Sequence, residues 1–320
     1  MFGQVVIGPP GSGKSTYCHG MLQFMSAIGR KCSIINLDPA NENLPYPTCS
    51  FDIRDYIRLE EIMKVHNLGP NGALMYAMES LDRSALEGLA DIWTEIGKSD
   101  YLIFDCPGQV ELFTHHNSFF QIFRLLTKKS DARLCSVSLV DSVHLTSASQ
   151  YISMLLLSLR AMVQLELPHV NVISKIDLLS SYRELPMRLD YYLEVQDLRQ
   201  LIPLVEQESP TVLGVNYVRL TELIADLVED YNLVSFEVLA IENKRSMIHL
   251  LQVIDKANGY AYGSLELGGD HIWAEAVRNS SNYDDVDLHD RWVENKAAYD
   301  EEERKEEQEL QEPVNDEDDL

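Results

Sequence analysis

A glycine-rich octapeptide near the N-terminus, Gly8 to Ser15, constrains the fold more than any other part of the sequence. It reads GPPGSGKS and matches the pattern G-x-x-x-x-G-K-[S/T] at every fixed position. An apolar run precedes it and a helical pattern follows it, which is the setting in which such a loop wraps phosphate groups. We therefore expect backbone N–H groups and the Lys14 amine to bind phosphate, and the Ser15 hydroxyl to reach Mg²⁺. The predicted phosphate-binding residues are Gly11, Ser12, Gly13, Lys14, Ser15 and Thr16.

Short apolar runs alternate with longer stretches of helical spacing along most of the chain. This order is typical of a parallel sheet covered by helices, so we predict an α/β P-loop NTPase fold with a mostly parallel central sheet. The candidate strands are Gln4 to Ile7, Ser33 to Leu37, Tyr101 to Phe104, Leu134 to Val140, His169 to Ile173 and Leu233 to Leu239. The candidate helices are Lys14 to Ile28, Ile53 to His66, Leu86 to Ile96, Phe119 to Leu126, Ile152 to Val163 and Leu220 to Tyr231.

The domain organisation follows from composition as well as from pattern. We expect one main domain over residues 1–262, with a helical insertion at about 185–218 that fits no strand. Residues 263–283 form an extension with little periodicity. From Asp284 to Leu320 the chain has 17 acidic and 4 basic residues, so this tail carries −13 of the net charge of −25. Its low apolar content predicts a disordered acidic tail, with a solvated helix over YDEEERKEEQEL as the alternative.

Charge and hydropathy argue against two classes of partner. The net charge of −25 argues against direct binding of nucleic acid, which needs clustered Lys and Arg side chains. No stretch reaches the roughly 18 consecutive apolar residues that a membrane span requires. The first residues, MFGQVVIG, lack the basic region of a secretory signal. We therefore expect a cytoplasmic protein without nucleic-acid or membrane contact.

A second candidate site follows the apolar run Tyr101 to Phe104. Asp105 stands at the end of this predicted strand, where P-loop proteins place a carboxylate that holds Mg²⁺. The chain continues as D-C-P-G-Q-V-E, in which the Gly108 N–H can face an outermost phosphate. Gln109 and Glu111 are then placed to orient or deprotonate an attacking water. The predicted metal ligands are Ser15 and Asp105, and the predicted catalytic residues here are Gln109 and Glu111.

The tetrapeptide Ser174 to Asp177 follows the fifth predicted strand and matches the guanine-reading pattern [N/T]-K-x-D at its Lys and Asp positions. An Asp carboxylate accepts hydrogen bonds from the ring N–H and the exocyclic amine of guanine, which adenine does not offer together. We expect the Lys175 stem to cover the face of the base and Asp177 to give specificity for GTP. Ser174 replaces the commoner Asn, which leaves a base contact or a brace to the P-loop in doubt.

Together these motifs resemble the GPN-loop GTPase family. The resemblance rests on five segments in this order: Gly8 to Ser15, NLDPA at 36–40, GPN at 69–71, Asp105 to Glu111, and Ser174 to Asp177. It covers residues 1–262, and the stretches LDYYLEV and VIDKANGY make the chain most similar to the type-two eukaryotic members. It implies a Mg²⁺-dependent, slowly hydrolysing GTPase that acts as a dimeric switch. The implied partners are a second copy or a related GPN-loop GTPase, and RNA polymerase subunits or assembly factors, with nuclear import and shuttling between cytoplasm and nucleus.

The GPN triplet predicts only a turn between two helices when its spacing is considered alone. The resemblance implies that this loop crosses a dimer interface and brings Asn71 to the γ-phosphate side of the partner's nucleotide. It also implies that Asp38 helps to organise Mg²⁺ and the attacking water. Gly69 and Pro70 are accordingly expected to be nucleotide-binding, and Asn71 and Asp38 catalytic.

The chain shows no motif for an arginine finger, the side chain that accelerates many related hydrolases by roughly 10³ to 10⁵-fold. Three cations, Arg54, Arg58 and Lys64, lie on the helix predicted before the GPN triplet. We expect them to form a solvated face and not a phosphate clamp. Slow turnover, which suits a switch, is therefore expected.

Two other functions stay open at this stage. The loop GPPGSGKS also resembles that of adenylate kinases, so one alternative is a P-loop kinase that passes a phosphoryl group to an acceptor other than water. The other alternative is a scaffold or assembly chaperone that holds nucleotide without turning it over. Equal affinity for ATP and GTP would favour the kinase, and a lack of phosphate release from GTP would favour the scaffold.

Overall fold

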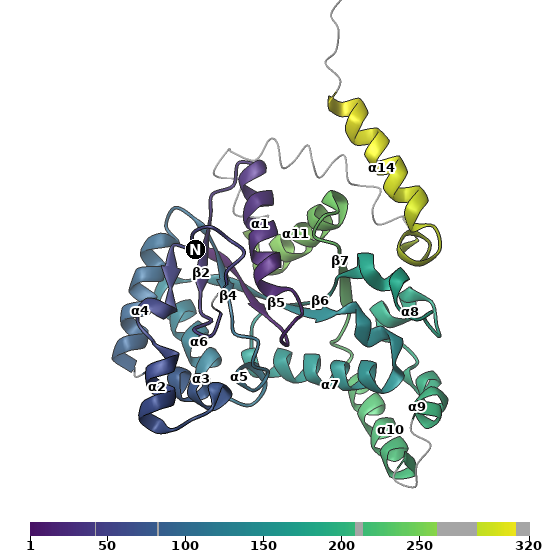
Figure 1. Ribbon diagram of the computed structural model, residues 1–320, viewed down its shortest axis with the longest axis horizontal. Coiled ribbons are helices and arrows are strands. Elements are labelled where there is room, and N and C mark those ends of the chain that lie inside the picture. The colour runs from purple at the N-terminus through teal and green to yellow at the C-terminus, as the bar shows by residue number, and fades with distance from the viewer. Residues whose placement is uncertain (42, 82, 209–213, 261–286, 312–320) are drawn as a thin grey trace, which may run out of the picture.

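The computed structural model describes residues 1–41, 43–81, 83–208, 214–260 and 287–311, and its centre is a twisted sheet (Figure 1). Seven strands of these ranges pair in the order β3-β2-β4-β1-β5-β6-β7, and all the pairs are parallel. The predicted α/β fold is thereby confirmed. The strands are β1 (Phe2–Ile7), β2 (Cys32–Asn36), β3 (Phe51–Asp52), β4 (Tyr101–Asp105), β5 (Arg133–Asp141), β6 (His169–Ser174) and β7 (Phe236–Leu239).

All six predicted strands are present, and β3 is the one that the sequence pattern misses. Phe51 and Asp52 pair with Ile35 and Asn36 at the edge of the sheet. Two residues are too few to show any alternation of apolar and polar side chains in a sequence. By contrast, β4 is buried along its whole length and reads as a continuous apolar run, because helices cover both faces of the sheet.

Helices cover both faces of the sheet and extend beyond its β7 edge (Figure 1). The helix predicted over 53–66 is divided into η1 (Ile53–Asp55) and α2 (Leu59–His66), because Asp52 caps the first and Arg58 has an extended backbone. Up to residue 260, the other helices of at least ten residues are α1 (Lys14–Ala27), α3 (Pro70–Glu79), α4 (Arg83–Ile96), α6 (Ser118–Ser130), α7 (Ala148–Leu165), α10 (Gly214–Tyr231) and α11 (Lys244–Asn258). The shorter segments are α5 (Glu111–Thr114), η2 (Ser142–Thr146), η3 (Ile176–Ser181), α8 (Leu189–Glu194), η4 (Leu198–Leu201) and α9 (Ile202–Glu208).

The side chains of the sheet point into separate cores. Val6 of β1 lies in the core with α1 and α11, and its neighbour Val5 lies in the core with α4 and α6. A third core at the β7 edge joins α7, α8, α9 and α10, so the predicted helical insertion is present between β6 and β7. Within the ranges given above, no helix combines the length and the apolar character needed to cross a membrane.

Part of the C-terminal acidic region is helical, which confirms the alternative of a helix over YDEEERKEEQEL and corrects the prediction of disorder for residues 287–311. A π-helical turn, η6 (Asp290–Glu294), leads into α14 (Lys296–Gln311). Trp292 is 1% exposed and packs into the third core with the insertion helices. The large indole ring of Trp292 alone buries much apolar area. The low apolar content of this segment as a whole gives no sign of that contact. The predicted extension at 263–283 lies outside the described residues.

Candidate functional site

The P-loop lies at the carboxyl end of β1, the central strand, between β4 and β5. This edge is where open parallel sheets hold their ligands. Its glycines adopt backbone conformations that other residues rarely take: φ is +146° at Gly8, +80° at Gly11 and +88° at Gly13. A Cβ atom at Gly8 would collide with the Leu139 carbonyl oxygen of β5. The glycines therefore let the loop turn tightly against the sheet before α1 begins.

Lys14 is the charged group at the centre of the P-loop. It is 8% exposed, and its Nζ donates a 3.0 Å hydrogen bond to the Pro9 carbonyl oxygen. Burial lowers the pKa of its ammonium group, and the nearby carboxylates of Asp105 and Asp38 oppose that change. Gly108 also lies against this amine, since a Cβ atom there would be 2.9 Å from Lys14 Nζ. Separate parts of the sequence thus converge on one loop.

Asp105 ends β4 and is aligned with Val6 of β1 and Asn36 of β2. It is 1% exposed; Oδ2 accepts a 3.0 Å hydrogen bond from the Tyr46 hydroxyl, while Oδ1 has no hydrogen-bond partner among the described residues. Burial raises the pKa of this carboxyl, and the nearby hydroxyls of Ser15 and Tyr46 oppose the change. A buried carboxylate oxygen without a protein partner, beside a P-loop hydroxyl, fits the hard oxygen donors that Mg²⁺ prefers.

Two residues of the segment between β2 and β3 join this end of the site, although no motif marks them. Tyr46, 3% exposed, donates its hydroxyl to the Asp105 carboxylate. Asn41 Nδ2 donates to Ser15 Oγ at 3.2 Å. Arg54 in turn donates to the Asn41 carbonyl oxygen at 2.9 Å; its side chain is 34% exposed, so this cation of the predicted solvated face also braces the segment. The segment is therefore tied to both predicted metal ligands.

The loop after β4 brings one of its three predicted residues, Gly108, into contact with the P-loop. A Cβ atom at Gly108 would be 3.1 Å from Pro10 Cα, so only glycine lets the loops approach this closely. Gln109 is half-buried, and its Oε1 is a buried acceptor with no hydrogen-bond partner in the described part of the chain. Glu111 is exposed at the first residue of α5. Gln109, next in sequence to Gly108, thus offers an unpartnered buried acceptor, whereas Glu111 faces solvent.

Asp38 follows β2 and is half-buried near the P-loop. Its Oδ1 accepts a 2.9 Å hydrogen bond from the Ala40 N–H, and its own N–H donates to Asn36 Oδ1. Burial raises its pKa, and the positive charges of Lys14 and Arg54 oppose this. The structure therefore places Asp38 within electrostatic reach of the phosphate-binding lysine.

Ser174 and Lys175 tie the end of β6 to the P-loop. The buried Ser174 hydroxyl donates to the Ser12 carbonyl oxygen at 2.8 Å. Lys175 Nζ donates to the Gly11 carbonyl oxygen and to Asp141 Oδ2, both at 2.7 Å. Ser174 stands where the commoner guanine-reading pattern has Asn. Its hydroxyl nevertheless bonds to the P-loop, so the contact between this motif and the P-loop is kept.

Asp177 lies on η3, the helical turn that begins directly after β6. The turn starts where Lys175 adopts a left-handed backbone conformation with φ of 57°. The Asp177 side chain is half-buried. Since Ser174 and Lys175 are bonded to the P-loop, the turn that carries Asp177 is held beside the same edge of the sheet.

The GPN triplet is the predicted element that the structure does not bring to this site. Gly69 caps α3, and Pro70 is its first residue, a position for which its fixed φ is suited. Gly69, Pro70 and Asn71 are all exposed. The predicted turn between two helices is confirmed, since α2 ends at His66. Within the described part of this single chain, no hydrogen bond joins the triplet to the P-loop.

The parallel sheet, the P-loop and the buried carboxylate at the end of β4 define a P-loop nucleoside triphosphatase. A family model described as a conserved hypothetical ATP binding protein matches residues 6–260. GPN-loop GTPase 2 of Saccharomyces cerevisiae is 57% identical over 97% of this chain and 91% of its own length. GPN-loop GTPase 2 of Schizosaccharomyces pombe is 51% identical over 93% of both chains. The chain belongs to the GPN-loop GTPase family, so the resemblance seen in its motifs and the expected enzyme class are confirmed.

The similarity extends to animals and to a solved structure. GPN-loop GTPase 2 of Danio rerio is 49% identical over 83% of each chain. The crystal structure of a GTPase in apo form from Pyrococcus abyssi matches with a TM-score of 0.61, covering 80% of this chain and 97% of that one. At 21% sequence identity, this match shows that the fold is shared.

Proposed function

We propose that this chain binds GTP with Mg²⁺, hydrolyses it slowly, and works as a dimeric switch. One observation carries the proposal: Ser174 and Lys175 are bonded to the backbone of the P-loop. The turn that would read the base and the loop that would hold the phosphates are therefore built as one unit. A guanine nucleotide is a ligand long enough to need both.

Ser15 and Asp105 are the residues that would hold Mg²⁺. The bound ion would supply positive charge to the β- and γ-phosphates during phosphoryl transfer. This chain's own contribution is to fix the two ligands: Tyr46 holds one oxygen of Asp105, and Asn41 contacts the Ser15 hydroxyl. Lys14 adds a buried positive charge beside them.

Hydrolysis needs a water held in line with the γ-phosphate, since phosphoryl transfer depends mainly on positioning and charge. We assign this task to Gln109, supported by its buried and unpartnered Oε1. The Gly108 N–H is assigned to the γ-phosphate, supported by its place against the Lys14 amine. Glu111 is assigned to activating or ordering the water from its place in the segment that follows Asp105, and Asp38 from the resemblance alone.

Dimerisation is proposed because the GPN triplet is exposed and the helix before it, α2, carries an exposed apolar side chain. None of the residues of α2 is buried in the single chain, and Val65 on that helix is 77% exposed. A second copy or a related GPN-loop GTPase would cover this face and receive Asn71 at its nucleotide. Mixing Asn71→Ala with wild-type protein tests this, because action across the interface gives a hydrolysis rate that depends on the mixture.

The client is proposed from family membership alone: RNA polymerase subunits or their assembly factors, with a role in nuclear import of the enzyme. The protein would then work in the cytoplasm and shuttle to the nucleus. Affinity purification from its own cells, compared between wild type and Lys14→Ala, tests this. If the wild-type protein and the Lys14→Ala variant recover the same proteins, binding of the client does not depend on nucleotide, which contradicts the proposal.

Phosphate release from GTP under single-turnover conditions is the experiment that tests the enzymatic proposal. Gln109→Leu and Glu111→Ala should keep GTP binding and lose turnover, since neither residue is assigned to ground-state binding. Loss of GTP affinity in the Gln109 variant would contradict its assignment. Transfer of phosphate to an acceptor other than water would favour a kinase, and no release even with a family partner would favour a scaffold.

A further inference from the structure

The segment from Asp287 to Lys305, which we call the C-terminal clasp, returns to the main domain and bonds to it at several places. Asp287 forms an ion pair of 2.6 Å with Arg188. His289 Nδ1 accepts a hydrogen bond of 3.1 Å from the Leu189 N–H at the start of α8. These contacts join residues about one hundred positions apart, so the clasp is part of the folded domain.

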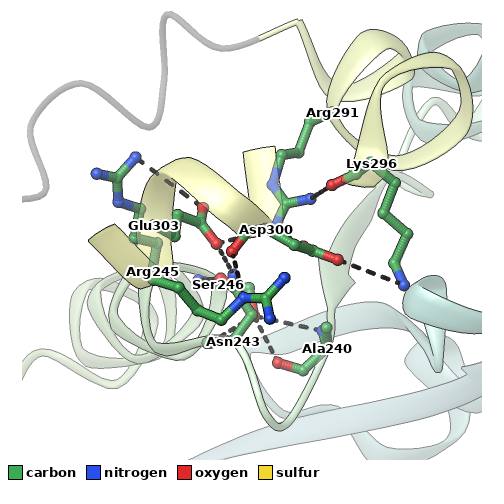
Figure 2. A network of polar contacts seen from close by, with 9 residues as sticks. Ala240, Asn243, Arg245, Ser246, Arg291, Lys296, Asp300 and Glu303 are labelled. Carbon is green, nitrogen blue, oxygen red and sulfur yellow. Dashed lines mark hydrogen bonds and ion pairs between the residues drawn. The ribbon is translucent and has the colours of Figure 1, made fainter. Parts of the chain in front are cut away.

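A buried cation organises the clasp internally. Arg291 is 2% exposed, and its NH2 group donates to Asp300 at 2.7 Å and to Glu303 at 2.9 Å (Figure 2). Its guanidinium also lies 4.3 Å from the centre of the Trp292 ring. A buried guanidinium needs such partners, because an uncompensated charge in this position is strongly destabilising. Arg291 therefore fixes how η6 and α14 meet.

Glu303 carries the contact from the clasp to the turn after β7. Its Oε2 accepts a 2.7 Å hydrogen bond from Asn243 Nδ2, and Asn243 caps α11 by accepting from the Ser246 N–H. The Ser246 hydroxyl donates to the Ala240 carbonyl oxygen at 2.7 Å, which closes the turn (Figure 2). One carboxylate thus joins the buried Arg291 to the turn at residues 240–246.

The clasp also touches η3, the turn that carries Asp177. The η6 turn packs against η3, and Trp292 shares a buried core with Ile176 and Leu179 on either side of Asp177. The strands that precede the two turns are neighbours, with Ser174 aligned with Leu239. The clasp therefore contacts both turns that lie at the carboxyl ends of β6 and β7.

We infer that the C-terminal clasp is a positioning element for the base side of the nucleotide site, acting through Glu303 and Trp292. The inference rests on the proposed function, in which Asp177 reads the guanine base. Glu303 holds the turn after β7, and Trp292 supports the turn that presents Asp177. If the docked clasp strengthens nucleotide binding, thermodynamic linkage requires that bound nucleotide stabilises the docked clasp by the same free energy.

The test compares Glu303→Ala with Glu301→Ala in the full-length protein. Glu301 is the matched control: it lies on the same helix, is 64% exposed, and contacts Lys305 one turn away. Release of fluorescent GDP is measured by stopped flow, and affinities for GDP and IDP are measured by titration. IDP lacks the exocyclic amine that Asp177 is assigned to bind, so the GDP-to-IDP affinity ratio reports the position of that carboxylate.

We expect Glu303→Ala to release GDP about three- to tenfold faster, the range in which contacts away from a ligand modulate its binding. The GDP-to-IDP ratio should fall, and Glu303→Gln should recover part of the effect because its amide oxygen can still accept from Asn243. Hydrogen exchange over residues 175–182 and 238–246 should speed up in Glu303→Ala but not in Glu301→Ala.

Equal release rates in the two variants would overturn the inference, and so would an equal loss of GDP and IDP affinity, which indicates general destabilisation. Failure of the proposed function is recognised separately. If Asp177→Ala keeps the wild-type preference for GDP over IDP, the base reader is misassigned, whatever Glu303→Ala does.

Discussion

The two halves of the nucleotide site are held together in different ways. The phosphate half is one continuous loop, Gly8 to Ser15, whose shape comes from glycines with positive φ and from the strand beneath it. In the proposed base half, the turn that carries Asp177 is held by hydrogen bonds between residues far apart in the chain, such as that from Ser174 to Ser12. A local pattern therefore specifies the first half, whereas the second depends on most of the chain being folded.

Lys14→Ala should have the largest effect and should break the phosphate half alone. It removes the buried cation that interacts electrostatically with Asp105 and Asp38, so the charges of these carboxylates are left to repel the phosphates. We expect GTP and ATP affinities each to fall by at least about 100-fold, in line with loss of a desolvated charge-assisted contact of several kcal/mol. Isothermal titration calorimetry measures both. Lys128→Ala, an exposed lysine on α6, should bind as wild type does.

Asp177→Ala should come next and should break the base half alone. Loss of two hydrogen bonds to guanine is expected to weaken GTP binding by about 10- to 100-fold, the value of one good bidentate contact to a base. ATP binding, which does not use this carboxylate, should hardly change. Competition titrations with both nucleotides give the ratio. An unchanged preference for GTP would show that another residue reads the base.

The same contrast explains what could be predicted from the sequence. The P-loop, Asp105 and Gly108 lie together as expected, because a glycine pattern and a strand end dictate local geometry. Tyr46 could not be predicted as a partner of Asp105, since its role follows from how a long loop folds over the sheet. The C-terminal clasp was hidden by its acidic composition, which gives no sign that Trp292 is buried.

Tyr46→Phe should sharpen the comparison with a smaller effect that stays within the phosphate half. The ring is kept, but Asp105 loses the hydroxyl that holds its Oδ2 at 3.0 Å. We expect the Mg²⁺ concentration for half-maximal tightening of GTP binding to rise about three- to tenfold, consistent with about 1 kcal/mol for one hydrogen bond. Nucleotide affinity in EDTA and the GTP-to-ATP ratio should stay unchanged. A changed ratio would mean that Tyr46 also influences the base half.

Ser174→Ala should have an effect of the same small size as Tyr46→Phe, and it tests the contact that joins the two halves. It removes the hydroxyl that donates to the Ser12 carbonyl oxygen, while the second link, from Lys175 to Gly11, remains. Loss of one buried hydrogen bond of about 1 kcal/mol predicts about fivefold weaker binding. GTP and ATP should weaken equally, because a brace to the P-loop serves any nucleotide. Ser181→Ala, which removes a local bond to Leu178, is the matched control. A loss of affinity for GTP alone would instead show that Ser174 helps to recognise the guanine base. The hydrogen bond from Ser174 to Ser12 would then belong to the base half and not to a brace shared by all nucleotides.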